Sequence, residues 1–356
     1  MVVREVLGVI YSPVKTFKKI VEKPNFKGVF LVLVLVMSAM ILVQFVAASK
    51  INVETRTPES DDWTEVLVST HAWTSNGVLS LDSIDYQMGN TNGNHSVASL
   101  AQNQTGIWMK LMDIGSVDCS GETGYNQLFF WVNWTNEYNI ADLLASNSEW
   151  GNVTLSVGSN QGWTANNSPD WAEITGLEFS LEWSAPTNLT LKLDGVHFSK
   201  FVPFLDVAGV GGVIQLAFVN LALPFAIDWI VWSGILLIVA KMFTEELGPW
   251  NNFFTIVGYS YIVTFIYTLL NMVAIASLPV INLPIDTTLA TAAINQTWVP
   301  VIWYQISNYL PIIERVWLAG LAAIIIKTMK DIPMGKVLTI VAISFGLRYL
   351  LSMFLF

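Results

Sequence analysis

The sequence predicts a multi-domain membrane protein in which an all-α bundle of five transmembrane spans carries an inserted all-β sandwich. Three observations lead to this fold class. Of the 356 residues, 53% are hydrophobic and only 12% are charged, whereas soluble domains are about 25% charged. Five apolar stretches are long enough to cross a bilayer, and one polar block shows the alternation of short strands. The expected parts are residues 1–49, 50–200 and 201–356.

The charge and cysteine counts exclude several classes of protein. The chain has 17 Lys and Arg residues against 27 Asp and Glu, a net charge of −10, so a nucleic-acid-binding surface is not expected. The high hydrophobicity excludes an intrinsically disordered chain. The only cysteine, Cys119, excludes an intrachain disulfide framework and a multi-cysteine zinc site.

The first span is expected at Val29 to Ser49, where 21 residues carry no charge. At about 1.5 Å per residue, this length matches the roughly 30 Å hydrocarbon core of a bilayer. A cleaved signal peptide is not expected, because 28 residues precede the stretch and no clear small-residue cleavage motif is present. Four more spans are expected at approximately residues 213–240, 253–280, 299–326 and 337–356.

Two patterns predict the orientation of these spans. The positive-inside rule places in the cytoplasm the side that collects most lysines and arginines, namely Arg4, Lys15, Lys18, Lys19, Lys23, Lys27, Lys241, Lys327, Lys330 and Lys336. All seven Asn-x-Ser/Thr sequons fall on the opposite side and are the expected glycosylation sites: Asn94, Asn103, Asn133, Asn152, Asn166, Asn188 and Asn295. We therefore expect a multi-pass plasma membrane protein with a cytoplasmic N-terminus, and with residues 50–200 and the C-terminus outside. External glycosylation favours an archaeal cell envelope over a eukaryotic Golgi membrane.

A short amphipathic helix is expected before the first span. Ser12 and Pro13 form a typical helix start. After it, one side of the helix carries Val14, Phe17, Ile20 and Val21, and the other carries Lys15, Lys18, Lys19 and Glu22. We expect this helix to lie in the membrane interface, with its apolar side in lipid and its lysines toward anionic headgroups. The alternative is a helix that packs under the bundle.

Three segments of the membrane part share a pattern with a known family. They read SPVKTFKKIVEKPNFKG before the first span, FTEELGPWNNFFTIVGYSYIVTFIYTLL at residues 243–270 and RVWLAGLAAIIIKTMKDIPMGKVLTIVAI at residues 315–343. This pattern resembles the Yip domain family, five-span proteins named for binding Ypt/Rab GTPases. The most specific piece is Gly258-Tyr259-Ser260-Tyr261, although Ile262-Val263 stand where the family usually has a proline. The resemblance implies five spans, an interior N-terminus and no established catalytic chemistry.

Four charged residues fall within the expected spans: Asp228, Glu314, Arg315 and Arg348. Three of them lie about 12 residues from a cytoplasmic lysine, or about 18 Å along a helix, so they share a depth near the membrane centre. An isolated charge there costs at least about 2.5–3.5 kcal/mol, so we expect the two acids to pair with the two arginines. The cluster is either a glue that fixes helix register or a polar site for a proton, an ion or a lipid headgroup. We favour the glue.

The polar block has strand-like runs separated by turns, which predict a β-sandwich. The runs are residues 78–86, 106–112, 127–134, 152–157, 174–183 and 189–198. Three pieces, NGNHSV at 92–97, YNQLFFWVNW at 125–134 and LKLDGVHFSK at 191–200, resemble the galactose-binding-like jelly roll of carbohydrate-binding modules. The resemblance implies adjacent ends of the insert and a structural calcium held by Asp194 and an acid near the first strand, namely Asp61, Asp62 or Asp82, with Asp62 taken forward. The alternative is that Asp194 merely caps a turn.

Nine of the 15 tryptophans lie in this block. Trp73, Trp150 and Trp163 fall in expected loops and are candidates to stack on sugar rings, although aromatic residues are also common in cores. Catalysis is not expected, because no cleft is evident between paired acids and the histidines show no ligand spacing.

The expected function is that of a non-enzymatic cell-envelope protein. Its bundle would organise the membrane or recruit partners, and its exterior domain would bind envelope glycans, a surface layer or another membrane protein. The alternative is a transport accessory or channel component that uses the intramembrane charges.

Overall fold

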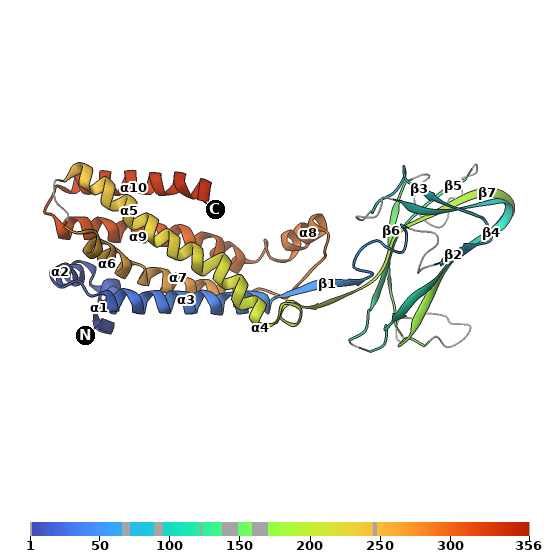
Figure 1. Cartoon of the computed structure of the whole chain (residues 1–356), viewed down its shortest axis with the longest axis horizontal. Helices are drawn as coiled ribbons and strands as arrows, with labels where there is room; N and C mark the ends of the chain where they lie inside the picture. Colours follow the sequence, from blue (N-terminus) through green and yellow to red (C-terminus); the bar gives the residue numbers. More distant parts are fainter. Residues whose placement is uncertain are drawn as a thin grey trace. The chain divides into compact units, whose positions relative to one another are not determined.

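A computed structural model describes residues 2–65, 72–88, 95–121, 123–136, 149–158, 170–244 and 248–355. The chain divides into a helical unit, Met1–Val53 with Pro203–Phe356, and a β unit, Glu54–Val202 (Figure 1). The boundaries fall close to the expected residues 50 and 200.

Five helical segments of the described chain are long and apolar enough to cross a membrane, and each overlaps most of one of the expected apolar stretches. The first is α3 (Phe26–Ala48), and the second joins α4 (Phe204–Ala217), a π-helical turn η1 (Phe218–Ala222) and α5 (Leu223–Phe243). The third joins α6 (Trp250–Ser260) and α7 (Ile262–Ala276), the fourth is α9 (Ile302–Met329) and the fifth belongs to α10 (Met334–Leu355). A short helix α8 (Thr287–Thr297) precedes α9.

Helices α3 and α6 approach very closely at two glycines. A Cβ atom added at Gly28 would lie 2.0 Å from the hydroxyl oxygen of Tyr259, and one at Gly258 would lie 2.4 Å from the Val29 side chain. The Tyr259 hydroxyl donates a hydrogen bond of 2.9 Å to the carbonyl of Asn25. The Gly-Tyr pair singled out in the sequence therefore forms a tight joint between the first and third spans.

The N-terminal helices α1 (Val2–Tyr11) and α2 (Pro13–Glu22) pack in the helical unit. Helix α2 begins at Pro13 as expected, although the Ser12 side chain makes no capping hydrogen bond. Phe17 and Ile20 are buried in the core of the unit, where α2 contacts α9. The expectation that this side of the helix faces lipid is therefore wrong for Phe17 and Ile20, because the bundle itself covers them, whereas Val14 of the same side is exposed.

The β unit is built on one mixed sheet. Its strands are β1 (Ile51–Thr57), β2 (Ala72–Ser75), β3 (Val78–Asp82), β4 (Ser96–Val117), β5 (Gln127–Asn136), β6 (Gly151–Ser156) and β7 (Ile174–Pro203). Strands β1 and β7 are hydrogen-bonded neighbours, so the two ends of the insert lie side by side as expected. The first three residues of β1, 51–53, belong to the helical unit and pair in parallel with β8 (Ile281–Leu283) of that same unit.

Two long strands fold this sheet over on itself (Figure 1). The first part of β4 pairs with β3 and the end of β7, whereas the second part pairs with β2 and the start of β7. Register shifts between Ala101 and Gly106 mark the bend, where bulges are expected to turn a strand. Phe130 of β5 packs edge-on against Phe179 of β7 with ring centres 4.9 Å apart, so the two halves share one core. This arrangement fits a β-sandwich.

Candidate functional site

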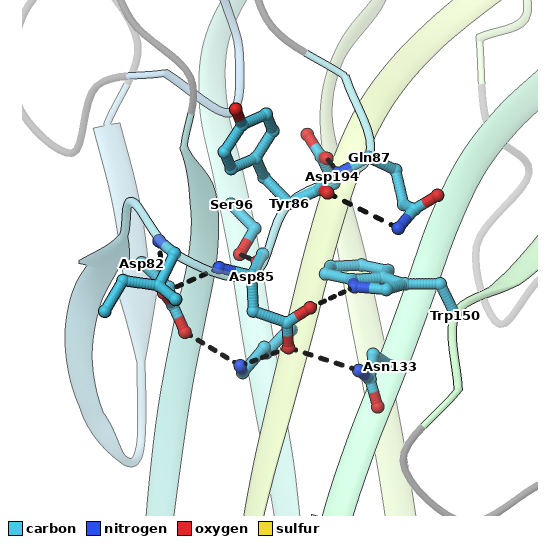
Figure 2. Close-up of polar contacts among 10 residues, drawn as sticks. Asp82, Asp85, Tyr86, Gln87, Ser96, Asn133, Trp150 and Asp194 are labelled. Atoms are coloured by element: carbon cyan, nitrogen blue, oxygen red, sulfur yellow. Dashed lines mark hydrogen bonds and ion pairs between the residues drawn. The ribbon is translucent and has the colours of Figure 1, made fainter.

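Five polar side chains meet on the outer face of the β unit and form the Trp150 cluster: Asp82, Asp85, Asn133, Trp150 and Lys192. Figure 2 labels all of them except Lys192. Asp85 is at the centre of the cluster. Its Oδ1 accepts a hydrogen bond of 2.6 Å from the Trp150 indole nitrogen, and its Oδ2 accepts bonds of 2.6 Å from Lys192 Nζ and 3.4 Å from Asn133 Nδ2. Lys192 also donates to Asp82 Oδ2 at 2.7 Å.

The alternation of the strands places these residues on one face. Asn133 of β5 lies directly opposite Lys192 of β7, and the next pair along is Val132 with Leu193. Successive side chains point to opposite faces of a strand, so the leucine and valine enter the core while the lysine and asparagine point outward. Asn133 is nevertheless buried, since Trp150 and the Asp85 side chain lie beside it (Figure 2).

Hydrogen bonds fix both acids of the cluster. Asp82 Oδ1 accepts the backbone N–H groups of Ile84 and Asp85 at 2.9 and 3.1 Å, and Ser96 Oγ donates to the Asp85 carbonyl at 2.7 Å. The bond from Lys192 lowers the pKa of Asp82 to about 2. Burial alone would lower the pKa of Lys192, but its bonds to the two aspartates raise it. The ion pair is therefore charged over the whole physiological pH range.

The loop that carries Asp85 presents apolar surface beside these charges. Ile84 is 92% exposed and Tyr86 is 36% exposed, and the side chain of Asp85 is 40% exposed. The Gln87 and Met88 backbone N–H groups donate to Asp194 Oδ2 at 2.5 and 2.7 Å, which anchors the end of the loop. A fixed indole, an exposed phenol and a preorganised charge pair can together bind a polar ligand with a flat apolar face.

Asp194 does not fit the calcium site that the sequence resemblance implied. It is fully buried, and beyond the two bonds from Gln87 and Met88, its Oδ1 accepts the Gly195 N–H at 2.8 Å and lies 3.3 Å from Thr64 Oγ1. Both oxygens thus accept backbone N–H groups, whereas calcium requires six to eight oxygen ligands. No group of three metal-binding acids, histidines or cysteines occurs among the described residues. These contacts fit the alternative, in which Asp194 stabilises a turn. Asp62 belongs to no group of metal-binding side chains among the described residues.

A second acid is buried next to Asp194. The Thr64 hydroxyl donates to Asp61 Oδ1, while Asp61 Oδ2 is buried and has no donor. Burial, followed by the charge of Asp194 among the raising effects, lifts the pKa of Asp61 to about 8 although the Thr64 bond opposes this shift. Asp61 therefore holds a proton at neutral pH, which allows the two carboxyl groups to lie together.

In the helical unit, two of the four charged residues expected within the spans form an ion pair. Arg348 donates to Asp228 through Nε at 2.8 Å and through Nη2 at 2.5 Å. The Tyr261 hydroxyl lies 3.3 Å from the same carboxylate, and the guanidinium stands over the ring of Trp232 at 5.1 Å. These contacts join α5, α10 and the residue that links α6 to α7, and they agree with a structural role that fixes helix register.

The other two charges do not pair with each other or with the first two at ion-pair distance. Glu314 Oε1 accepts a bond of 2.5 Å from the Thr264 hydroxyl, and Arg315 is exposed. Neither makes an ion pair within 4 Å in the described part of the chain. The expectation that both acids pair with both arginines is therefore correct for Asp228 and Arg348 only. A helix turns by 100° per residue, so neighbours such as 314 and 315 cannot both face one partner.

The tryptophans and sequon asparagines expected as exposed sites differ in how exposed they are in the structure. Trp73 lies in β2, is 5% exposed and donates to the Trp63 carbonyl, so the expectation of an exposed loop tryptophan is wrong there. Trp163, Asn94 and Asn166 lie outside the described residues. Asn133 is buried, whereas the remaining sequon asparagines are exposed: Asn103, Asn152, Asn188 and Asn295.

Sequence reasoning found Trp150 and named Asp82 and Asn133 for other roles, but it did not connect any of these residues with one another. Lys192 could have been found from the alternation of LTLKLD, which puts a lysine on the face opposite the leucines. Asp85 carries no such signal, since it lies in a loop. Comparison with models of known protein families and with curated proteins gave no match, so the assignment of function rests on the residues themselves.

Proposed function

We propose that the protein is a multi-pass membrane protein whose helical unit crosses the bilayer five times and whose β unit, a jelly roll, faces the exterior. Five long apolar helices support the spans. The one-sided distribution of lysines and sequons supports a cytoplasmic N-terminus. The similarity to the Yip domain family in the span sequences agrees with this topology and favours a role in membrane organisation or partner recruitment.

The β unit acts as a binding module, and its ligand is a glycan of the cell envelope. The observation that carries this proposal is the Trp150 cluster, where a hydrogen bond to Asp85 holds an indole next to a charge pair, in a site whose loop also carries the partly exposed Tyr86. Sugars present an apolar face for stacking and hydroxyl groups for hydrogen bonds, which suits this combination of groups. No catalytic step is proposed, since Asp82 and Asp85 are both held by Lys192.

Binding of envelope oligosaccharides to the full-length protein in detergent tests this function. We expect Trp150→Ala and Tyr86→Ala to weaken binding at least tenfold, because each removes an aromatic contact worth about 0.5–1.5 kcal/mol together with its buried area. Trp108→Ala is the matched control, since Trp108 is a partly exposed tryptophan of β4 outside the cluster. Unchanged affinity in both cluster variants, or equal loss in the control, would contradict the proposal.

A transport or channel role for the helical unit is the alternative. The bidentate pair of Asp228 and Arg348 argues against it, because both charges are satisfied by each other. Solute or ion flux in liposomes that is lost on Asp228→Asn or Arg348→Gln would favour the alternative instead.

A further inference from the structure

The helical unit contains a cavity of about 430 Å³ around the charged residues. Helices α3, α5, α7, α9 and α10 contribute side chains to its wall, which includes Asp228, Glu314, Arg315 and Arg348. Glu314 lies 12 residues from the start of α9 and 15 from its end, so the cavity is close to the middle of that helix. Its volume lies in the range of small-ligand pockets.

The ion pair leaves one acid and one base of the cavity wall without a charged partner. Asp228 and Arg348 satisfy each other. Glu314 accepts a hydrogen bond from the Thr264 hydroxyl, and neither Glu314 nor Arg315 makes an ion pair within the described residues. A charge in the interior of a membrane is costly without a partner and marks a functional site by default. The cavity therefore offers a carboxylate and a guanidinium to a ligand.

Helix irregularities occur at the wall of the same cavity. Leu221 belongs to the π-helical turn η1. Pro311 lies inside α9, four residues after Ser307, whose backbone carbonyl would accept the N–H of any other residue at that position. Proline removes a backbone donor from the helix ladder, and single π-helical turns are frequent at functional sites. One element of the cavity wall is thus a π-helical turn, and another helix lacks a backbone donor three residues before Glu314.

The cavity opens sideways through the wall of the bundle. Pro311, Arg315 and Tyr349 line it and are also exposed on the outside of the helical unit, whose surface carries many large apolar side chains. With the proposed five spans, this opening faces lipid rather than water. A ligand enters from the bilayer, and its apolar portion stays there.

We propose that the cavity binds a phospholipid headgroup that carries both an ammonium and a phosphate. The ammonium lies against Glu314 and the phosphate against Arg315, while the acyl chains remain outside. Such a headgroup matches one acid and one base, whereas an anionic headgroup without an ammonium would leave Glu314 unpaired next to added negative charge. A primary ammonium also donates hydrogen bonds to the carboxylate, which a quaternary ammonium cannot do. The inference rests on the proposed membrane location of the helical unit but not on ligand binding by the β unit.

The test measures lipid binding to the full-length protein by native mass spectrometry from detergent. Dioleoyl phosphatidylethanolamine is the probe, and dioleoyl phosphatidylglycerol and phosphatidylcholine are the comparisons. We expect the ethanolamine lipid to bind at least tenfold more tightly than either. Glu314→Gln should abolish this preference while some phosphate binding remains, and Arg315→Gln should weaken all three lipids. Equal binding of the three lipids by the unmodified protein would overturn the proposal.

Two controls separate loss of the site from loss of the fold. Glu22→Gln and Lys336→Gln neutralise exposed charges of the helical unit outside the cavity and should leave the lipid preference unchanged. Each cavity variant is used only if it melts within a few degrees of the unmodified protein, and Glu314→Asp, which keeps the charge, should retain the preference. Soluble phosphoethanolamine should not compete at millimolar concentration. Competition as strong as that of the lipid would show a site for a free solute and overturn the lipid assignment.

Discussion

Replacing Asp61 by asparagine should stabilise the β unit at neutral and alkaline pH. Asp61 is 4% exposed, and its Oδ2 has no donor while the Asp194 carboxylate lies beside it. The asparagine amide keeps an acceptor for Thr64 and places an N–H donor where the protonated acid holds its proton. The variant therefore resembles the protonated state at every pH.

The magnitude follows from the pKa of this carboxyl group, which rises from 3.8 to about 8 on folding. The stability that comes from the bound proton is complete below about pH 4 and is lost as the pH rises through about 8. Between these limits each pH unit removes about 1.4 kcal/mol. A pH of 7 is about three units above the unfolded pKa, so the free energy of unfolding of the β unit is by then lower by roughly 4 kcal/mol than at acid pH. Asp61→Asn should restore most of this loss.

The single cysteine supplies an assay within the full-length protein. Cys119 is 3% exposed in the core of the β unit, so an alkylating reagent reaches it only when the unit opens. A tenfold change in the equilibrium constant for opening corresponds to about 1.4 kcal/mol. Labelling of Asp61→Asn at pH 8 should therefore be at least about 100-fold slower than labelling of the unmodified protein. Comparing the two proteins at one pH cancels the ionisation of the exposed thiol.

The difference between the proteins should shrink toward pH 4, where the unmodified carboxyl group is protonated whether the unit is folded or open. Glu59→Gln removes an exposed carboxylate from the same segment and should change labelling by less than about twofold. Equal labelling rates at pH 8, or a ratio that does not vary with pH, would refute the reasoning that a buried proton links Asp61 and Asp194.

Three further predictions concern the helical unit and the sequons. Gly28→Ala should lower the melting temperature of the full-length protein by several degrees, because the added methyl group meets the Tyr259 ring. Gly320→Ala is the control and should be neutral, because Gly320 has open space around it. Equal melting temperatures of the two variants would contradict the close contact between α3 and α6. Arg348→Met should cost about 3–5 kcal/mol by stranding the charge of Asp228, and the double variant with Asp228→Leu should recover most of it, as read from detergent unfolding curves; a double variant less stable than the single one would refute a purely structural pair. Asn133 should carry no glycan in peptide mass spectra of the native protein, since its side chain is buried; a modified Asn133 would show that the β unit is modified before it folds.

The helices were predictable because the signals that define them are local. A run of about 20 apolar residues specifies a long helix without reference to the rest of the chain, and all five segments appear where they were expected. The sequence also placed Asp228 and Arg348 at one depth by counting residues from lysines. It could not show which acid faces which arginine, because that depends on the rotation of each helix about its axis.

The β unit shows the limit of local signals more clearly. The runs 174–183 and 189–198 alternate as two strands, yet both belong to the single strand β7, which bends through register shifts. Turn-like residues such as Pro186 and Asn188 therefore mark a bend rather than a break. Trp73 was expected in a loop because its neighbours are polar, but a four-residue strand buries it. Burial of this kind is decided by partner strands distant in the sequence.

The two groups of charges differ in what their pairing contributes. Lys192 with Asp82 and Asp85 is partly exposed to solvent, where an ion pair adds little stability, so its main effect is to hold Asp85 and hence the indole of Trp150 in one orientation. Inside the bundle, the ion pair of Asp228 and Arg348 mainly offsets the cost of burying its two charges, because either charge alone would be destabilising there. Glu314 and Arg315 have no such compensation from the chain. A ligand that brings both charges supplies it, and a zwitterionic headgroup is the component of a bilayer that does so.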